Sequence, residues 1–167
     1  MTSTVAWQPA YVGIGSNLDD PQSRVRRAFD QLRAVPQSAA FVHSSLYRSA
    51  PMGPGDQPDF VNAVAAFLTR MDGAELLQAL QAMESAQDRQ HGERWGPRTL
   101  DLDLLVLGRT VTDTAGLAIP HPRISERNFV LLPLAEIAPY LLVPGQGSVV
   151  RMVAAVAGKG PRIESLA

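Results

Sequence analysis

The succession of apolar patterns along this chain is compatible with few folds. Four segments have the composition of strands, at 11–14, 41–48, 60–68 and 99–107. Two segments between them carry apolar residues at helical spacing, at 20–34 and 73–87. Side chains alternate between two faces along a strand but return to one face every three or four residues along a helix. The order strand, helix, strand, strand, helix, strand predicts an α+β fold, a ferredoxin-like βαββαβ arrangement with an antiparallel sheet and helices packed on one face.

Features at the ends of these segments support the assignment. Asp20 followed by Pro21 is typical of a helix start. The connection at 49–58 is longer than a hairpin needs, which favours a functional loop. Another helix is expected at 126–138, distorted by Pro133, and a short one at 149–157. We expect a single domain over 1–167, with its motif-bearing part at about 10–143 and C-terminal additions after it.

Composition excludes several classes of protein. The chain has 167 residues, a net charge of -1 and no cysteine. A disulfide framework, a zinc finger or a thiol nucleophile is therefore excluded, and a general nucleic-acid binder would be clearly basic. Residues 1–10 lack the pattern of a signal peptide, and no apolar run is long enough to span a bilayer. We expect a cytoplasmic monomer that binds neither nucleic acid nor membrane.

Lysine is almost absent from the chain. Lys159 is the only one, and it lies between two glycines with no hydroxyl residue after it. A Walker A loop needs its lysine to be followed by Ser or Thr, so this phosphate-binding motif is excluded. Any phosphate would be bound by arginines, which pair bidentately with phosphate oxygens.

The segment 95–107 contains the strongest candidate for a chemical site. Asp101 and Asp103 alternate onto one face of the predicted strand, with α-carbons about 6.5 to 7 Å apart. Two such carboxylates can hold hard cations. The alternative is a half-buried strand whose acidic residues merely face solvent. Arg89, Arg94 and Arg98 precede the pair, and carboxylate-bound cations beside arginines are typical of phosphoryl-transfer sites, which favours polyphosphate binding.

Other candidates each have a structural alternative. Trp95 on its glycine-flanked loop could anchor that loop to the core or close over a flat ligand. His121 between two prolines could contact phosphate or be structural. Phe60 and Asn62 share one face of their strand and could form a platform and an amide contact for a heterocycle, or Phe60 could belong to the core.

The segment from Trp95 to Asp103 reads Trp95-Gly-Pro-Arg98-Thr-Leu-Asp101-Leu-Asp103 and is the most specific motif of the chain. Further motifs are Gly15-Ser-Asn-Leu18, Ser44-Ser-Leu-Tyr-Arg48, Gly53-Pro54 with Asp56-Gln-Pro58, Pro120-His121, and Pro133-Leu134 with Glu136-Ile-Ala-Pro139. Together these motifs resemble those of the 6-hydroxymethyl-7,8-dihydropterin pyrophosphokinases of folate biosynthesis. The resemblance implies transfer of diphosphate from ATP to the hydroxymethyl group of the dihydropterin, with release of AMP and two Mg²⁺ ions.

The resemblance also implies residue roles. Asp101 and Asp103 would bind the metal ions and, with Arg89 and Arg98, form the catalytic set. The residues that would contact ATP are Gln81, Glu84, Arg89, Trp95, Arg98, Leu104, His121 and Arg127. The residues that would contact the pterin are Ser49, Ala50, Met52, Phe60, Asn62, Trp95, Asp101 and Phe129.

Some positions depart from the family pattern. Phe60 stands where many members have tyrosine, and the segment 89–94 is one residue shorter than usual. Gly116, Ala118 and Pro122 provide few side-chain contacts for a nucleotide. Two other functions stay open: a non-catalytic ferredoxin-like module that binds nucleotide or RNA, and a kinase that forms phosphohistidine on His121.

Overall fold

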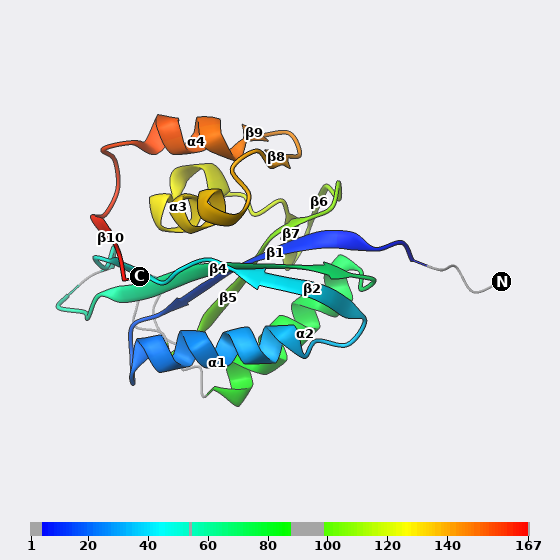
Figure 1. Cartoon of the computed structure of the whole chain (residues 1–167), viewed down its shortest axis with the longest axis horizontal. Coiled ribbons are helices and arrows are strands. Elements are labelled where there is room, and N and C mark those ends of the chain that lie inside the picture. Colours follow the sequence, from blue (N-terminus) through cyan, green and yellow to red (C-terminus); the bar gives the residue numbers. More distant parts are fainter. Residues whose placement is uncertain (1–4, 54, 88–98, 167) are drawn as a thin grey trace.

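The computed structural model of the chain describes residues 5–53, 55–87 and 99–166 (Figure 1). The strands of the main sheet are β1 (Gln8–Ser16), β2 (Ser38–His43), β3 (Tyr47–Ser49), β4 (Phe60–Thr69), β5 (Asp101–Leu107) and β10 (Ile163–Ser165). The helices are α1 (Pro21–Arg33), α2 (Gly73–Ala86), α3 (Asn128–Ile137) and α4 (Val149–Val156), with a 3-10 turn η1 (Ile124–Glu126) before α3. Two small hairpins complete the fold, β6 (Thr112–Thr114) with β7 (Leu117–Ile119) and β8 (Leu142–Val143) with β9 (Gly147–Ser148).

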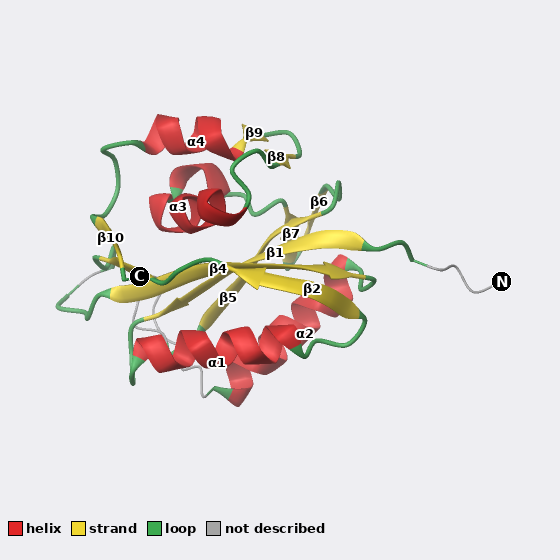
Figure 2. Cartoon of the chain, in the orientation of Figure 1, coloured by secondary structure: helices red, strands yellow, loops and turns green. Residues whose placement is uncertain are grey.

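The main sheet is antiparallel in all its described pairings. Its order is β10-β3-β4-β1-β5, and β2 pairs with the same edge of β4 as β3. Helices α1 and α2 lie on one face of the sheet, and α3 and α4 lie on the other (Figure 2). The ferredoxin-like α+β prediction is confirmed. The elements after residue 143 are β9, α4 and β10, and α4 packs on α3.

Two apolar layers hold the sheet between its helices. The stripe predicted on α1 is buried against one face: Val25, Ala28, Phe29 and Leu32. Leu131 and Leu134 of α3 belong to the cluster on the other face, and Met152 of α4 joins that cluster from the outer side, where α4 packs on α3. Burial of apolar surface is the main stabilising contribution to such a core. Among the described residues, none of the helices combines the length and the apolar character needed to cross a bilayer.

The helix starts follow their sequence signals. The Asp20 carboxylate accepts a hydrogen bond from the Ser23 hydroxyl at 2.7 Å, next to Pro21 at the first position of α1. Asp72 and Glu75 form a reciprocal capping box at the start of α2, each backbone N–H to side-chain oxygen distance being 2.9 Å. Pro133 lies inside α3, which extends to Ile137.

The strand expected at 41–48 is wrong as a single element, because the chain breaks at Ser44 to form β2 and β3. The Ser44 N–H donates to the carbonyl of Val64 at 2.8 Å, and its hydroxyl accepts from the Val64 N–H at 3.0 Å. One buried serine thus supplies both partners that β4 needs at this point. The strand expected at 99–107 begins two residues later, at Asp101.

The strict alternation expected along β5 also fails, at Leu105. The register with β1 shifts there, with Val12 opposite Leu104 and Tyr11 opposite Val106. Such a bulge inserts one extra residue and changes which face the following side chains occupy. Leu105 and Val106 therefore both pack with the α3 layer. The face of β5 that carries Asp101 and Asp103 is therefore followed by residues buried in the core.

Candidate active site

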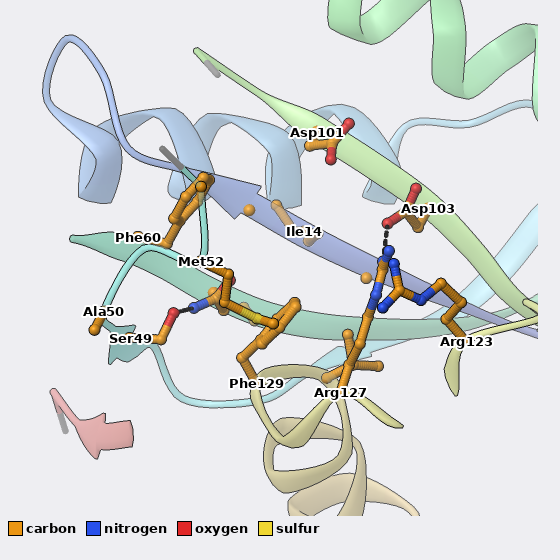
Figure 3. A pocket seen from close by; sticks show the side chains of 16 residues that line it. Ile14, Ser49, Ala50, Met52, Phe60, Asp101, Asp103, Arg123, Arg127 and Phe129 are labelled. Carbon is orange, nitrogen blue, oxygen red and sulfur yellow. Dashed lines mark hydrogen bonds and ion pairs between the residues drawn. The ribbon is translucent and has the colours of Figure 1, made fainter. Parts of the chain in front are cut away.

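A cavity of about 250 Å³ opens where β1, β4 and β5 meet the start of α3. Its lining combines aromatic, amide, carboxylate and guanidinium groups (Figure 3). The residues that line it are Gly13, Ile14, Gly15, Ser49, Ala50, Met52, Gly53, Phe60, Asn62, Ala63, Asp101, Asp103, Arg123, Arg127, Phe129 and Val130. Several predicted site residues, far apart in sequence, are therefore brought together.

Strand register explains the floor of this cavity. Gly15 of β1 lies opposite Asn62 of β4 on one side and Asp101 of β5 on the other. Neighbouring strands are about 4.8 Å apart, so the amide and the carboxylate stand roughly 10 Å apart across a residue without a side chain. A Cβ on Gly15 would lie 3.4 Å from Asn62 Oδ1 and would narrow this space. The floor can accommodate a flat ligand between a hydrogen-bonding amide and an acid.

The apolar end of the cavity is formed by Phe60, Met52 and Phe129. Phe60 opens β4 and Phe129 lies in the first turn of α3, and both project into the cavity from different walls (Figure 3). The buried Asn62 donates from Nδ2 to Ser49 Oγ at 2.7 Å, which fixes the orientation of its amide. Two aromatic rings beside an oriented amide suit a planar heterocycle.

The charged end is formed by Asp101, Asp103, Arg123 and Arg127. Arg127 Nη1 lies 3.5 Å from Asp103 Oδ2, and Arg123 Nε lies 3.0 Å from a Glu126 carboxylate oxygen. Burial lowers the pKa of Arg127 from its ordinary value, while Asp103 acts in the opposite direction. Two guanidinium groups beside two carboxylates can neutralise an anion and also retain acceptors for a cation.

A second cavity of about 330 Å³ lies on the other side of Asp103. It is formed by the start of β5, one face of α2 and the β6–β7 hairpin. Its lining residues are Leu77, Leu102, Asp103, Leu104, Thr114, Gly116, Leu117, Ala118, His121 and Pro122. Asp103 lines both cavities. Two ligands bound in them would therefore meet at this carboxylate.

His121 stands at this boundary as a neutral group. Burial, followed by the charges of Arg127 and Arg123, lowers the pKa of His121 to about 4, against an opposing contribution from Asp101. Its Nδ1 lies 3.1 Å from the Arg123 backbone nitrogen, which donates to it. The remaining ring proton is therefore on Nε2, where His121 can donate a neutral hydrogen bond.

The predicted ATP contacts on α2 have different environments. Gln81 is exposed, whereas Glu84 is buried and its Oε1 accepts a 2.8 Å hydrogen bond from the Leu102 N–H. Leu104 is buried in β5 beside the second cavity. Arg89, Trp95 and Arg98 lie outside the described residues, as does the whole of the shortened segment 89–94.

Both residues that flank segment 88–98 are buried and anchored. Gln87 caps the end of α2. Its backbone carbonyl accepts a hydrogen bond from Arg24 Nη1 at 3.0 Å, and its side-chain Nε2 donates to Gln31 Oε1 at 2.9 Å. At the other end, the Ser16 hydroxyl donates to the carbonyl of Thr99. Helix α1 and strand β1 therefore fix the positions of Gln87 and Thr99, the two described residues on either side of 88–98.

Among the charged residues that line the first cavity, Arg123 is the one that the sequence does not single out. It follows the Pro120-His121 motif by two residues, and an isolated arginine in a loop has no pattern that separates it from a solvated surface charge. The fold brings it beside Arg127, which lies four residues further along the chain, after the 3-10 turn η1 (Figure 3). Gly15 belongs to a motif that is visible in the sequence, but only the register shows that it lies between Asn62 and Asp101.

Comparisons with known proteins agree with this geometry. The model of the family described as 7,8-dihydro-6-hydroxymethylpterin-pyrophosphokinase (HPPK) matches residues 11–139. A 2-amino-4-hydroxy-6-hydroxymethyldihydropteridine pyrophosphokinase of Pseudomonas aeruginosa is 44% identical over 153 residues, covering 92% of this chain and 94% of that protein. The protein of the same description from Haemophilus influenzae is 40% identical over 144 residues, covering 86% and 90%.

Solved structures show the same fold at low sequence identity. A Plasmodium falciparum HPPK-DHPS crystal structure with pteroate superposes with a TM-score of 0.71 and 11% identity, covering 95% of this chain. This chain spans only 44% of that longer protein. The fold likeness, the family model and the curated relatives agree. The chain belongs to the 7,8-dihydro-6-hydroxymethylpterin-pyrophosphokinase family.

Proposed function

We propose that this protein transfers the diphosphate group of ATP to the hydroxymethyl oxygen of 6-hydroxymethyl-7,8-dihydropterin, releasing AMP, as a step of tetrahydrofolate biosynthesis. The observation that carries the proposal is the row Asn62, Gly15 and Asp101 across three neighbouring strands. It places a fixed amide and a carboxylate on one cavity floor, about two strand spacings apart. A ring held at the amide end would direct its substituent toward the acid.

The apolar end of the cavity would hold the pterin. Phe60 and Phe129 would contact its faces, and Asn62 would hydrogen-bond its polar edge with an amide already oriented by Ser49. The rest of this wall would come from Ala50 and Met52, which line the same cavity. Trp95, outside the described residues, stays a proposed contact on the basis of the family resemblance.

ATP would occupy the second cavity and extend its phosphates past Asp103. The residues proposed to contact it are Gln81, Glu84, Arg89, Trp95, Arg98, Leu104, His121 and Arg127. His121 would donate from Nε2 without a net charge of its own. Arg127 would leave its 3.5 Å contact with Asp103 in part to pair with phosphate oxygens.

The chemical step needs no covalent nucleophile on the protein. The hydroxymethyl oxygen forms a bond to the β-phosphorus while the bond from that phosphorus to the α–β bridging oxygen breaks, and AMP leaves with that oxygen. The hydroxyl proton departs on the Asp101 side of the cavity. Positioning the two substrates and neutralising phosphate charge supply most of the acceleration in such transfers.

The donor set at the charged end fits Mg²⁺, and we propose two ions held by Asp101 and Asp103. Mg²⁺ is usually bound by one or two carboxylates, with water and substrate phosphates completing an octahedron. Neither carboxylate is fully buried, and no group of three or more potential ligand side chains occurs among the described residues. Asp101 and Asp103 would hold the ions there, and the chemistry supplied would be neutralisation of phosphate charge.

A non-catalytic RNA-binding module has less support. Proteins that bind RNA on a β-sheet stack its bases on an open sheet face, whereas helices lie on both faces of this sheet (Figure 2).

A search for acid-labile phosphate on the protein tests the phosphohistidine alternative at His121. We further propose that the enzyme is a cytoplasmic monomer formed by a single domain over 1–167.

Separation of the nucleotide products tests the proposed reaction. Incubation with ATP, Mg²⁺ and the dihydropterin alcohol should yield AMP and no ADP. Omitting the dihydropterin should abolish AMP formation, and chelation of Mg²⁺ with EDTA should do the same. Formation of ADP as the product would reject diphosphate transfer.

A further inference from the structure

The C-terminal chain returns from α4 to the sheet edge, where β10 lies beside β3 (Figure 1). We refer to residues 158–166 as the tail segment. Its strand β10 pairs antiparallel with β3, with Ile163 opposite Ser49. Two backbone hydrogen bonds extend the contact, from the Ala50 N–H to the Arg162 carbonyl at 3.4 Å and from the Leu166 N–H to the Leu46 carbonyl at 2.8 Å. The tail segment lies beyond residues 11–139, which match the family model.

Strand β3 depends on this partner because it is short. It consists of Tyr47–Ser49 and is bound by β4 on one edge and β10 on the other. Ile163, Ser49 and Phe60 form one row across the three strands. Ser49 accepts the hydrogen bond that orients Asn62. The position of the tail segment is thereby linked to two groups of the proposed pterin site.

One buried side chain, Asn128, holds the tail segment. It is the first residue of α3 and is 8% exposed. Its Nδ2 donates to two carbonyl oxygens of the tail segment, those of Lys159 at 3.0 Å and Pro161 at 2.8 Å. Both amide protons are therefore used on residues that flank Gly160.

Gly160 permits this contact. Its φ is +80°, and a Cβ there would lie 3.2 Å from the amide atoms of Asn128. The backbone consequently rests directly on the Asn128 amide, which only a glycine allows. Gly158 has a similar φ of +74°, but nothing lies within 4 Å of the Cβ position.

Asn128 also lies between two residues of the cavity. Arg127 and Phe129 line it from the start of α3, whereas Ser49 and Ala50 line it from the edge of the sheet (Figure 3). The Asn128 contacts connect these two walls through the tail segment. We propose that Asn128 is a positioning residue for the pterin site, acting through the tail segment on Ser49 and Ala50. This inference rests on the proposed function, because it assigns that end of the cavity to the dihydropterin.

Four full-length proteins test the inference: wild type, N128A, G160A and G158A. N128A removes the two hydrogen bonds, and G160A displaces the tail segment while retaining the amide. We expect both to raise the KM for the dihydropterin about tenfold, with the KM for ATP within about twofold of wild type. G158A has comparable backbone strain without the Asn128 contact, so its dihydropterin KM should stay near that of wild type.

A second readout does not depend on activity. Amide hydrogen exchange should accelerate over residues 46–50 in N128A and G160A but not in G158A, because β3 loses its outer partner. Combining N128A with G160A should add little to either single change, since both act on one contact. G160A gives a result even if N128A does not fold.

The outcomes separate the two proposals. If wild type releases AMP but N128A and G160A leave both the dihydropterin KM and the exchange unchanged, Asn128 has no positioning role. Equal increases in the KM for both substrates would also overturn it, because they would indicate a general disturbance. Failure of wild type to release AMP would instead contradict the proposed function. In that case the amide exchange of residues 46–50 in N128A and G160A would still show whether the tail segment orders β3.

Discussion

At the residue scale, Asp103 occupies the boundary of both cavities. Asp103→Asn keeps the shape of the side chain but removes the charge that a cation and Arg127 require. We predict that kcat/KM falls at least about a hundredfold, in the range seen for loss of one electrostatic contact to a transition state. Asp113→Asn on β6, exposed and outside both cavities, should have little effect. Steady-state kinetics with circular dichroism as a folding check measures this, and retained Mg²⁺-dependent turnover in Asp103→Asn would reject the metal assignment.

Phe60 tests the aromatic end of the cavity. Loss of a ring stacked on a base costs about 1–3 kcal/mol in comparable sites, so Phe60→Leu should raise the dihydropterin KM roughly tenfold. Phe60→Tyr retains the ring and matches many family members, so it should stay close to wild type. Initial rates at varied dihydropterin measure the difference. Equal KM values for all three proteins would assign Phe60 to the core alone.

His121 gives the protein a pH-dependent stability. Its pKa is about 4 in the folded chain, against an ordinary value of 6.5. Between these values the unfolded chain binds a proton that the folded chain does not, so stability is complete above pH 6.5 and falls as the pH decreases toward 4. Because His121 is partly exposed, we expect the free energy of unfolding to fall by about 1–2 kcal/mol over this pH range.

Urea unfolding in metal-free buffer at pH 7.5 and pH 5 measures this effect. His121→Gln, which does not titrate, should lose less stability than wild type over the same interval. The same dependence in both proteins would show that His121 is not its cause. The comparison uses stability alone, so it is independent of the assigned reaction.

At the scale of secondary structure elements, the Glu84 carboxylate ties α2 to β5. Glu84 is 4% exposed and accepts from the Leu102 N–H at 2.8 Å. Glu84→Ala should lower the free energy of unfolding by about 1–3 kcal/mol, because it leaves a buried donor without this partner. Gln81→Ala, one turn earlier and exposed, should change it by less than about 0.5 kcal/mol.

Denaturant titration of both variants decides whether Glu84 has this structural role. Glu84→Gln retains an oxygen acceptor and should lose less stability than Glu84→Ala. An equal and small effect of all three substitutions would mean that the hydrogen bond does not hold β5. A role of Glu84 toward ATP would appear separately, in the KM for ATP.

Local signals predicted the elements that depend on nearby residues. The stripe from Val25 to Leu32 is buried as expected, and Asp101 and Asp103 do share the cavity side of β5. The elements that depend on distant partners were missed. The break at Ser44 needs Val64, and the bulge at Leu105 needs the register of β1. Strand β10 has little apolar pattern of its own and is defined by its pairing with β3.

At the scale of the whole molecule, the first cavity is lined by residues of β1, β3, β4, β5 and α3, which are far apart in the sequence. Residues such as Asp101 and Asp103 could be predicted because they lie in short motifs that match the family. Arg123 and the Asn128 contacts could not be found in that way, because their importance depends on which walls the fold brings together. The residues Arg89, Trp95 and Arg98 stay predictions, since they lie outside the described residues.

The mass of the pterin product tests the central claim most directly. With ATP and Mg²⁺, the account predicts that the dihydropterin gains two phosphoryl groups in one turnover and that one AMP forms for each product molecule. A label in the γ-phosphate of ATP should appear in the pterin product. A pterin that gains a single phosphoryl group, accompanied by ADP, would contradict the account.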